Sequence, residues 1–128
     1  MNDCYCDYDI PEFYRSEIRR ARKPHQCCEC GAQIEPRDEY EYASGKYEGT
    51  MFSYKTCRRC YNLRMWVQNN VPCFCWAHYN MIDDAKEAIS DAYLRAGNEV
   101  AGLRFGFARR VYHIEKYAKQ HAFKREIA

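Results

Sequence analysis

No run of apolar residues in this sequence approaches the roughly 18 residues that a membrane-spanning helix needs, so we expect no transmembrane segment. The first residues, Met1 to Cys4, do not place a basic flank before an apolar stretch. We therefore expect no secretory signal and a cytoplasmic location. Neither an internal repeat nor a low-complexity linker interrupts the 128 residues. This length predicts one domain over residues 1–128.

The motifs of common enzyme classes are also missing. No glycine-rich loop could cradle a phosphate, and no serine or cysteine nucleophile has a base partner that the sequence identifies. Zinc deaminases need Pro-Cys-x-x-Cys, whereas Pro72-Cys73-Phe74-Cys75 has a shorter spacing. Nucleases of the His-Asn-His kind need histidines on the hairpin and the following helix, but residues 39–42 and 63–67 contain none. We expect a protein that is not an enzyme and has no small-molecule substrate.

Nine cysteines are the strongest compositional signal. An odd number in close pairs favours metal thiolates over disulfides. Cys27 and Cys30 flank a Cys-x-x-Cys-Gly turn that ends in Gly31, and Cys57 and Cys60 form a second Cys-x-x-Cys at the expected start of a helix. Four thiolates in a closed tetrahedron bind Zn²⁺ structurally, and the helix dipole helps to stabilise them. The first predicted site is this zinc site.

A second, less specific set consists of two Cys-x-Cys pairs, Cys4-x-Cys6 and Cys73-x-Cys75. These four thiols would form a second zinc site if the N-terminus folds back onto residues 73–75, with His78 as an alternative ligand. An iron–sulfur cluster is the minor alternative for either set. Cys28 is left over, and we expect it to point away from the metal.

Periodicity and turn residues predict the elements. A helix is expected from the N-cap Asp9 to Pro24, with Tyr14, Ile18 and Ala21 on one face and Arg15, Arg19 and Arg22 on another. A β-hairpin is expected over residues 39–56, turning at Ser44-Gly45-Lys46. Three further helices are expected from near Cys57 to before Pro72, from Asn80 to Gly97, and from about Gly106 onward. The fold class is therefore α+β, with a treble-clef-like or zinc-ribbon-like core over 27–70 and a helical pair over 80–128.

Several of these motifs together resemble small cysteine-rich zinc-binding proteins of phages and prophages. The resemblance is carried by Cys4-x-Cys6-Asp7-Tyr8-Asp9, Phe13-Tyr14, Ala21-Arg22-Lys23, Cys27-x-x-Cys30, Thr56-Cys57-x-x-Cys60, Cys73-x-Cys75-Trp76 and Gly102-Leu103-Arg104-Phe105-Gly106-Phe107. That group has no settled activity, so the resemblance implies an origin and a metal rather than a function. It also raises the hypothesis of an inhibitor that binds and blocks a host protein complex, in the manner of anti-defence or anti-CRISPR proteins.

The charge distribution suggests where partners would bind. The net charge is only +2, but residues 104–128 carry seven Lys and Arg against two Glu. On the last expected helix one stripe consists of Arg109, His113, Lys116, Gln120 and Lys124, and a second stripe consists of Arg15, Arg19 and Arg22. Arg58, Arg59 and Arg64 are expected on the surface of the helix that begins near Cys57. Such stripes could hold nucleic-acid phosphates or an acidic protein surface, or could simply be solvated. The first functional hypothesis is association with nucleic acid, and the alternative is the host-complex inhibitor.

Overall fold

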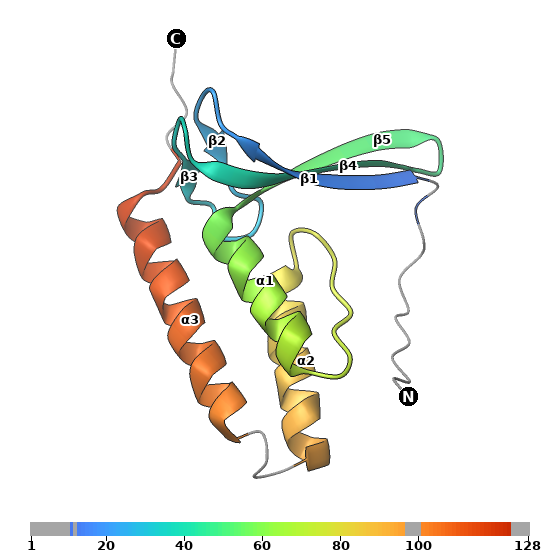
Figure 1. Ribbon diagram of the computed structural model, residues 1–128, viewed down its shortest axis with the longest axis vertical. Coiled ribbons are helices and arrows are strands. Elements are labelled where there is room, and N and C mark those ends of the chain that lie inside the picture. The colour runs from blue at the N-terminus through green and yellow to red at the C-terminus, as the bar shows by residue number, and fades with distance from the viewer. Residues whose placement is uncertain (1–10, 12, 97–100, 124–128) are drawn as a thin grey trace.

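The structure, a computed structural model, describes residues 11, 13–96 and 101–123, with strands in the first half and helices in the second (Figure 1). In chain order the elements are β1 (Phe13–Arg20), β2 (His25–Gln26), β3 (Gln33–Ile34), β4 (Glu39–Tyr47), β5 (Thr50–Cys57), α1 (Arg58–Asn70), α2 (Met81–Ala96) and α3 (Ala101–Gln120). This arrangement confirms the predicted α+β class.

The central strand of the main sheet is β4, which pairs with β1 on one side and β5 on the other, both antiparallel. Residues directly opposite each other share a face of the sheet. Tyr42 lies opposite Glu17 and Lys55 and belongs to the outer face, whereas Glu41 belongs to the face that meets α1. All three helices extend from this inner side (Figure 1). The short strands β2 and β3 form a separate pair near the end of α3.

The prediction of a helix over residues 9–24 is wrong for residues 13–20, which form β1. Tyr14, Ile18 and Ala21 have helical spacing, but all eight residues of β1 pair with β4. The long hairpin strand β4 offers a row of backbone N–H and C=O groups, and β1 satisfies them. Strand pairing of this kind depends on a distant partner, so local periodicity did not reveal it. The expected N-cap, Asp9, lies outside the described residues.

The hairpin is confirmed, but its turn lies later than predicted. Glu48 and Gly49 occupy the turn, and both have positive φ (48° and 80°), as a two-residue hairpin turn requires. Gly45 lies inside β4 instead. A Cβ on Gly45 would lie 2.3 Å from the backbone oxygen of Phe13, so this glycine allows β1 and β4 to approach closely.

The helices after the hairpin follow the prediction more closely. α1 begins directly after its N-cap Cys57, and α2 begins directly after Asn80. α3 begins at Ala101, earlier than the expected Gly106. Gly106 lies inside the helix, at a position where it faces the ring of Trp66. The core that joins these helices is apolar and includes Leu63, Val67, Met81, Ala85, Ile89, Phe107 and Ile114. No helix in the described part of the chain is long and apolar enough to cross a bilayer.

The close contact at Gly45 generates a stability prediction. Gly45→Ala places a methyl group against the backbone of β1 and the ring of Phe52, and overpacking of this kind costs about 1–3 kcal/mol. Gly102→Ala is the matched control, because nothing lies within 4 Å of that Cβ position. We expect urea denaturation to show a lower free energy of unfolding for Gly45→Ala only. Equal stability of the two variants would contradict the register of β1 on β4.

Candidate metal centre

Four of the predicted ligands come together at the junction of the sheet and α1. The sulfurs of Cys27, Cys30, Cys57 and Cys60 all lie within 4.8 Å of one another. Cys30 Sγ and Cys57 Sγ are 3.7 Å apart. A tetrahedral Zn²⁺ with Zn–S bonds of about 2.3 Å separates its sulfurs by about 3.8 Å. The cluster therefore has the dimensions of a tetrathiolate metal site, as the sequence predicted.

Local backbone structure holds each pair in place. Gly31 has φ 78°, and its N–H donates to the carbonyl of Cys27 to close the first turn. The second pair spans the end of β5 and the first turn of α1, with Cys57 as the N-cap and Cys60 one turn on. Backbone N–H groups also point at sulfur: those of Glu29 and Cys57 donate to Cys27 Sγ, at 3.4 and 3.3 Å. Such donors stabilise a thiolate.

The electrostatics of the cluster call for a cation. The pKa of Cys27 is lowered because the thiols of Cys30, Cys57 and Cys60 donate hydrogen bonds to it. The pKa values of Cys57 and Cys60 are raised, first because each donates to Cys27 and further because both are buried. Cys27 also raises the pKa of Cys30, but the hydrogen bonds from Cys57 and Cys60 outweigh this and lower it. Without a metal ion the four sulfurs therefore do not all ionise together. A divalent metal ion would allow all four sulfurs to ionise, so these residues fit such an ion.

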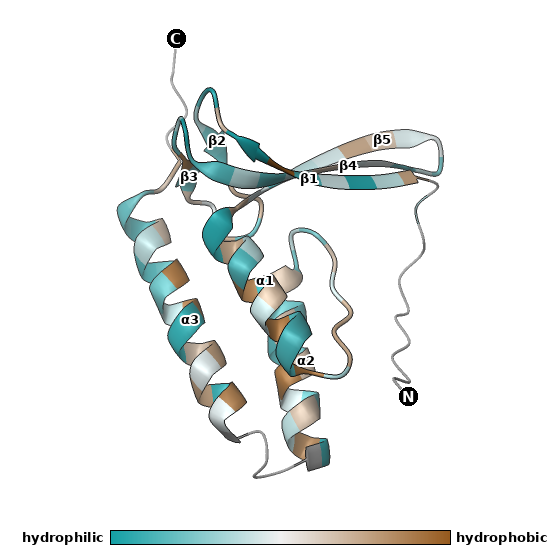
Figure 2. Cartoon of the chain, in the orientation of Figure 1, coloured by the Kyte–Doolittle hydropathy of each residue, from teal (hydrophilic) through white to brown (hydrophobic). Residues whose placement is uncertain are grey.

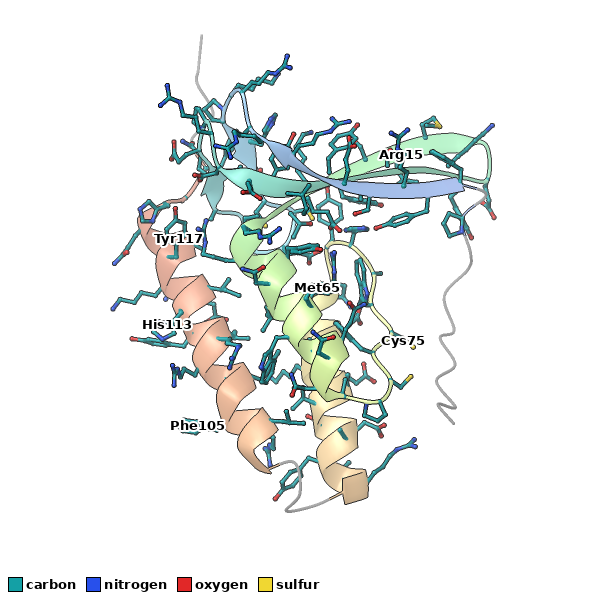
Figure 3. The ribbon with its side chains drawn as sticks, viewed as in Figure 1. Arg15, Met65, Cys75, Phe105, His113 and Tyr117 are labelled. Atoms are coloured by element: carbon teal, nitrogen blue, oxygen red, sulfur yellow. The ribbon has the colours of Figure 1, made fainter. Side chains whose placement is uncertain are left out.

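The second predicted set is described only in part. Cys73 and Cys75 lie on the segment between α1 and α2 (Figure 3), and both are disulfide-bonded, although not to each other, since their sulfurs are 3.8 Å apart. A disulfide sulfur is not a thiolate, so in this state neither cysteine is the zinc ligand that the sequence predicted. Cys4 and Cys6 lie outside the described residues, so a second site stays a prediction. His78, named as an alternative ligand for this set, lies instead beside Cys28 and Glu29.

The cationic residues do not all lie where the sequence suggested. Arg15 and Arg19 share the outer face of β1, and Arg22 follows the end of that strand. On α3 the residues Arg109, His113 and Lys116 are exposed as expected, whereas Lys124 lies outside the described residues. Arg15 and His113 are far apart in Figure 3, so the two predicted stripes form separate surfaces.

Arg64 was expected on the surface of α1, and that prediction is wrong. Its guanidinium is buried and donates two hydrogen bonds to Glu41 of β4, which also accepts one from Ser16 of β1. Burial raises the pKa of Glu41, but the bonds from Arg64 more than offset this and hold the pKa below its usual value. The guanidinium also lies 4.2 Å from the ring centroid of Trp76. Only the tertiary structure reveals this link between sheet and helix.

An aromatic cluster surrounds His78 next to this ion pair, and sequence reasoning also missed it. The ring of His78 stacks on Tyr54, with centroids 4.3 Å apart, and meets Trp76 edge-on. Its Nε2 lies 3.0 Å from the hydroxyl of Tyr14. Burial lowers the pKa of His78 to about 4 and raises that of Cys28 to about 12, so both side chains are neutral at pH 7 without a metal.

The fold and the four-cysteine cluster together define the class: a small α+β protein whose cysteines could bind a metal ion. Comparison with known proteins adds no relative. No protein-family model matches the chain, and neither a curated protein nor a solved structure matches it. The resemblance to phage and prophage proteins therefore stays a prediction from motifs.

The ligand assignment predicts a sharp difference between Cys28 and Cys30, which only Glu29 separates in the sequence. Cys30→Ser removes a sulfur of the cluster, and structural zinc is worth roughly 10–16 kcal/mol in finger peptides. We expect Cys30→Ser to lose one metal ion per chain and most of its fold, measured by elemental analysis and circular dichroism. Cys28→Ser is the control and should stay folded. Equal loss of fold in both variants would show that the four ligands are wrongly assigned.

The buried ion pair predicts a second difference. Arg64→Met leaves Glu41 as an unpaired buried carboxylate, a change that typically costs about 3–5 kcal/mol. The double variant Glu41→Gln/Arg64→Met removes both charges and should regain much of this loss. Arg95→Met is the control, because its partner Asp91 and Arg95 itself are exposed, and such pairs are worth about 0–1 kcal/mol. Chemical denaturation measures all three; additive losses in the double variant would contradict the pairing.

Proposed function

We propose that this chain is a non-catalytic, zinc-stabilised protein that binds nucleic-acid phosphates through a basic surface centred on Arg20. The observation that carries this proposal is a pair of open depressions that share Arg20. The first, about 680 Å³, is lined by Arg19, Arg20, Arg22, Lys23, His25 and Tyr40. The second, about 400 Å³, includes Arg20, Arg37, Arg58 and Arg59 in its lining. We call these two depressions with their cations the Arg20 surface.

Most cations of the Arg20 surface form no ion pair with another described residue. Of the cations that line these two depressions, only Arg19 forms an ion pair with another described residue, Glu17. The second depression also contains Asp38 and Glu39, but Asp38 accepts a hydrogen bond from the backbone of Glu35. Hydrophilic colour covers this region, over β2 and the first turn of α1 (Figure 2). Unpaired arginines gathered around a depression suit phosphate groups, which accept their bidentate hydrogen bonds.

Aromatic rings lie directly beneath some of these cations. The guanidinium of Arg19 lies 3.9 Å from the ring centroid of Tyr42, and that of Arg59 lies 3.4 Å from that of Tyr117. Both rings hold a planar cation, whose other face is suited to stacking on a base. This combination favours nucleic acid over a simple acidic protein surface. The order of cysteine turn, hairpin and helix further supports a treble-clef topology for the metal-binding core.

The third helix provides a matched control for testing the Arg20 surface. Arg20→Gln/Arg22→Gln/Lys23→Gln removes three exposed cations there, and Arg109→Gln/Lys116→Gln/Lys119→Gln removes three exposed cations on α3. Each change lowers the net charge equally. We expect only the first triple variant to bind labelled single-stranded and duplex oligonucleotides more weakly. Its slope of log affinity against log salt should fall by up to about 0.9 per lost duplex contact, or about 0.7 on single strands.

Two outcomes would contradict the proposal. Equal weakening in both triple variants would show that overall charge, rather than the Arg20 surface, drives binding. Absence of oligonucleotide binding by the folded wild-type protein would remove nucleic acid as the partner. In that case a protein captured from bacterial lysate after nuclease treatment, and lost with the first triple variant, would favour the host-complex inhibitor.

A further inference from the structure

The structure assigns a further metal site, distinct from the four-cysteine cluster, to Cys28, Glu29 and His78. We infer that these three side chains bind a divalent transition metal ion of the Zn²⁺ type, with one coordination position left for water. Their candidate ligand atoms all lie within 4.8 Å of one another. Thiolate, carboxylate and imidazole are the ligands that Zn²⁺ takes in proteins, and sites with three protein ligands keep an open position.

The distances within the cluster agree with one shared ion. Cys28 Sγ and Glu29 Oε2 are 3.6 Å apart. For a tetrahedral ion with bonds of about 2.3 Å to sulfur and about 2.1 Å to oxygen, this edge would be about 3.6 Å. The thiolate and the carboxylate would together supply two negative charges. The nearby Glu41 is already neutralised by Arg64, so the two charges match a divalent cation.

One of the two ring nitrogens of His78 is available to bind a metal ion. Its Nε2 is engaged with the hydroxyl of Tyr14 at 3.0 Å, whereas its Nδ1 is buried and has no hydrogen-bond partner among the described residues. Buried polar atoms without partners are rare and call for an explanation. A metal ion at Nδ1 would fix the proton on Nε2, which then donates to Tyr14. Metal-bound histidines typically donate their second nitrogen in this way.

The carboxylate of Glu29 is also held in position. Its Oε2 accepts from the backbone N–H of Tyr79 at 2.9 Å, and its Oε1 accepts from that of Met81 at 3.1 Å. These bonds anchor Glu29 to the start of α2, on the same segment that carries His78. A carboxylate has about four acceptor positions, so it can keep both bonds and still bind a metal. The site therefore joins the first cysteine turn to the segment before α2.

Metal counting on the full chain tests this site. Wild-type protein, as purified and then saturated with Co²⁺, should contain one more metal ion per chain than Cys28→Ser or His78→Gln, by elemental analysis. Wild type should also show a sulfur-to-cobalt charge-transfer band that Cys28→Ser lacks. Tyr14→Phe keeps all three ligands but loses the contact to Nε2, so it should bind Co²⁺ about 10–100-fold more weakly.

The variants separate this site from the other cysteines. Circular dichroism verifies the fold of each one, and unchanged metal in the four-cysteine cluster is the expected internal standard. An equal metal count in wild type, Cys28→Ser and His78→Gln would overturn the site. So would a cobalt band of equal intensity in wild type and Cys28→Ser, because the added Co²⁺ would then be bound by other cysteines only.

Discussion

The convergence of four sulfurs at the start of α1 is the constraint on which the rest of this structure depends. Cys57 ends β5, caps α1 and contributes a sulfur to the cluster. A metal ion there would fix the first cysteine turn, the hairpin and the helix relative to one another at a single point. Such a link would add to the stability that the apolar core supplies, because binding of a structural metal ion is coupled to folding.

A second link, the buried pair of Glu41 and Arg64, joins β4 of the sheet to α1. Its cost of desolvation is high, and the geometry offsets that cost only because both carboxylate oxygens accept from one guanidinium. Ser16 connects the same carboxylate to β1. The edge strand is therefore tied to the interior by a polar contact rather than by an apolar one, and most of its side chains remain exposed.

The proposed binding surface depends on the same junction. Arg58 and Arg59 begin α1, one residue after Cys57, and Arg20 ends β1. The cluster and the β1–β4 pairing bring these cations to one depression although they are far apart in the sequence. Metal and nucleic acid would consequently be coupled: loss of the ion would disperse the cations, and bound phosphate would stabilise the arrangement that holds the ion.

What the sequence determined by itself is local. The spacing of Cys27 and Cys30 and of Cys57 and Cys60 predicted the metal cluster, because a two-residue gap lets two sulfurs meet one ion in any fold. Helical periodicity likewise predicted most of α2, and the tyrosine-rich alternation predicted the hairpin, although not the position of its turn. The tertiary structure decided everything that needed a distant partner: β1 is a strand because β4 pairs with it, and Arg64 is buried because Glu41 faces it. It also brought His78 beside Cys28 and Glu29. These residues are about fifty positions apart in the sequence, so no local spacing predicts their contact.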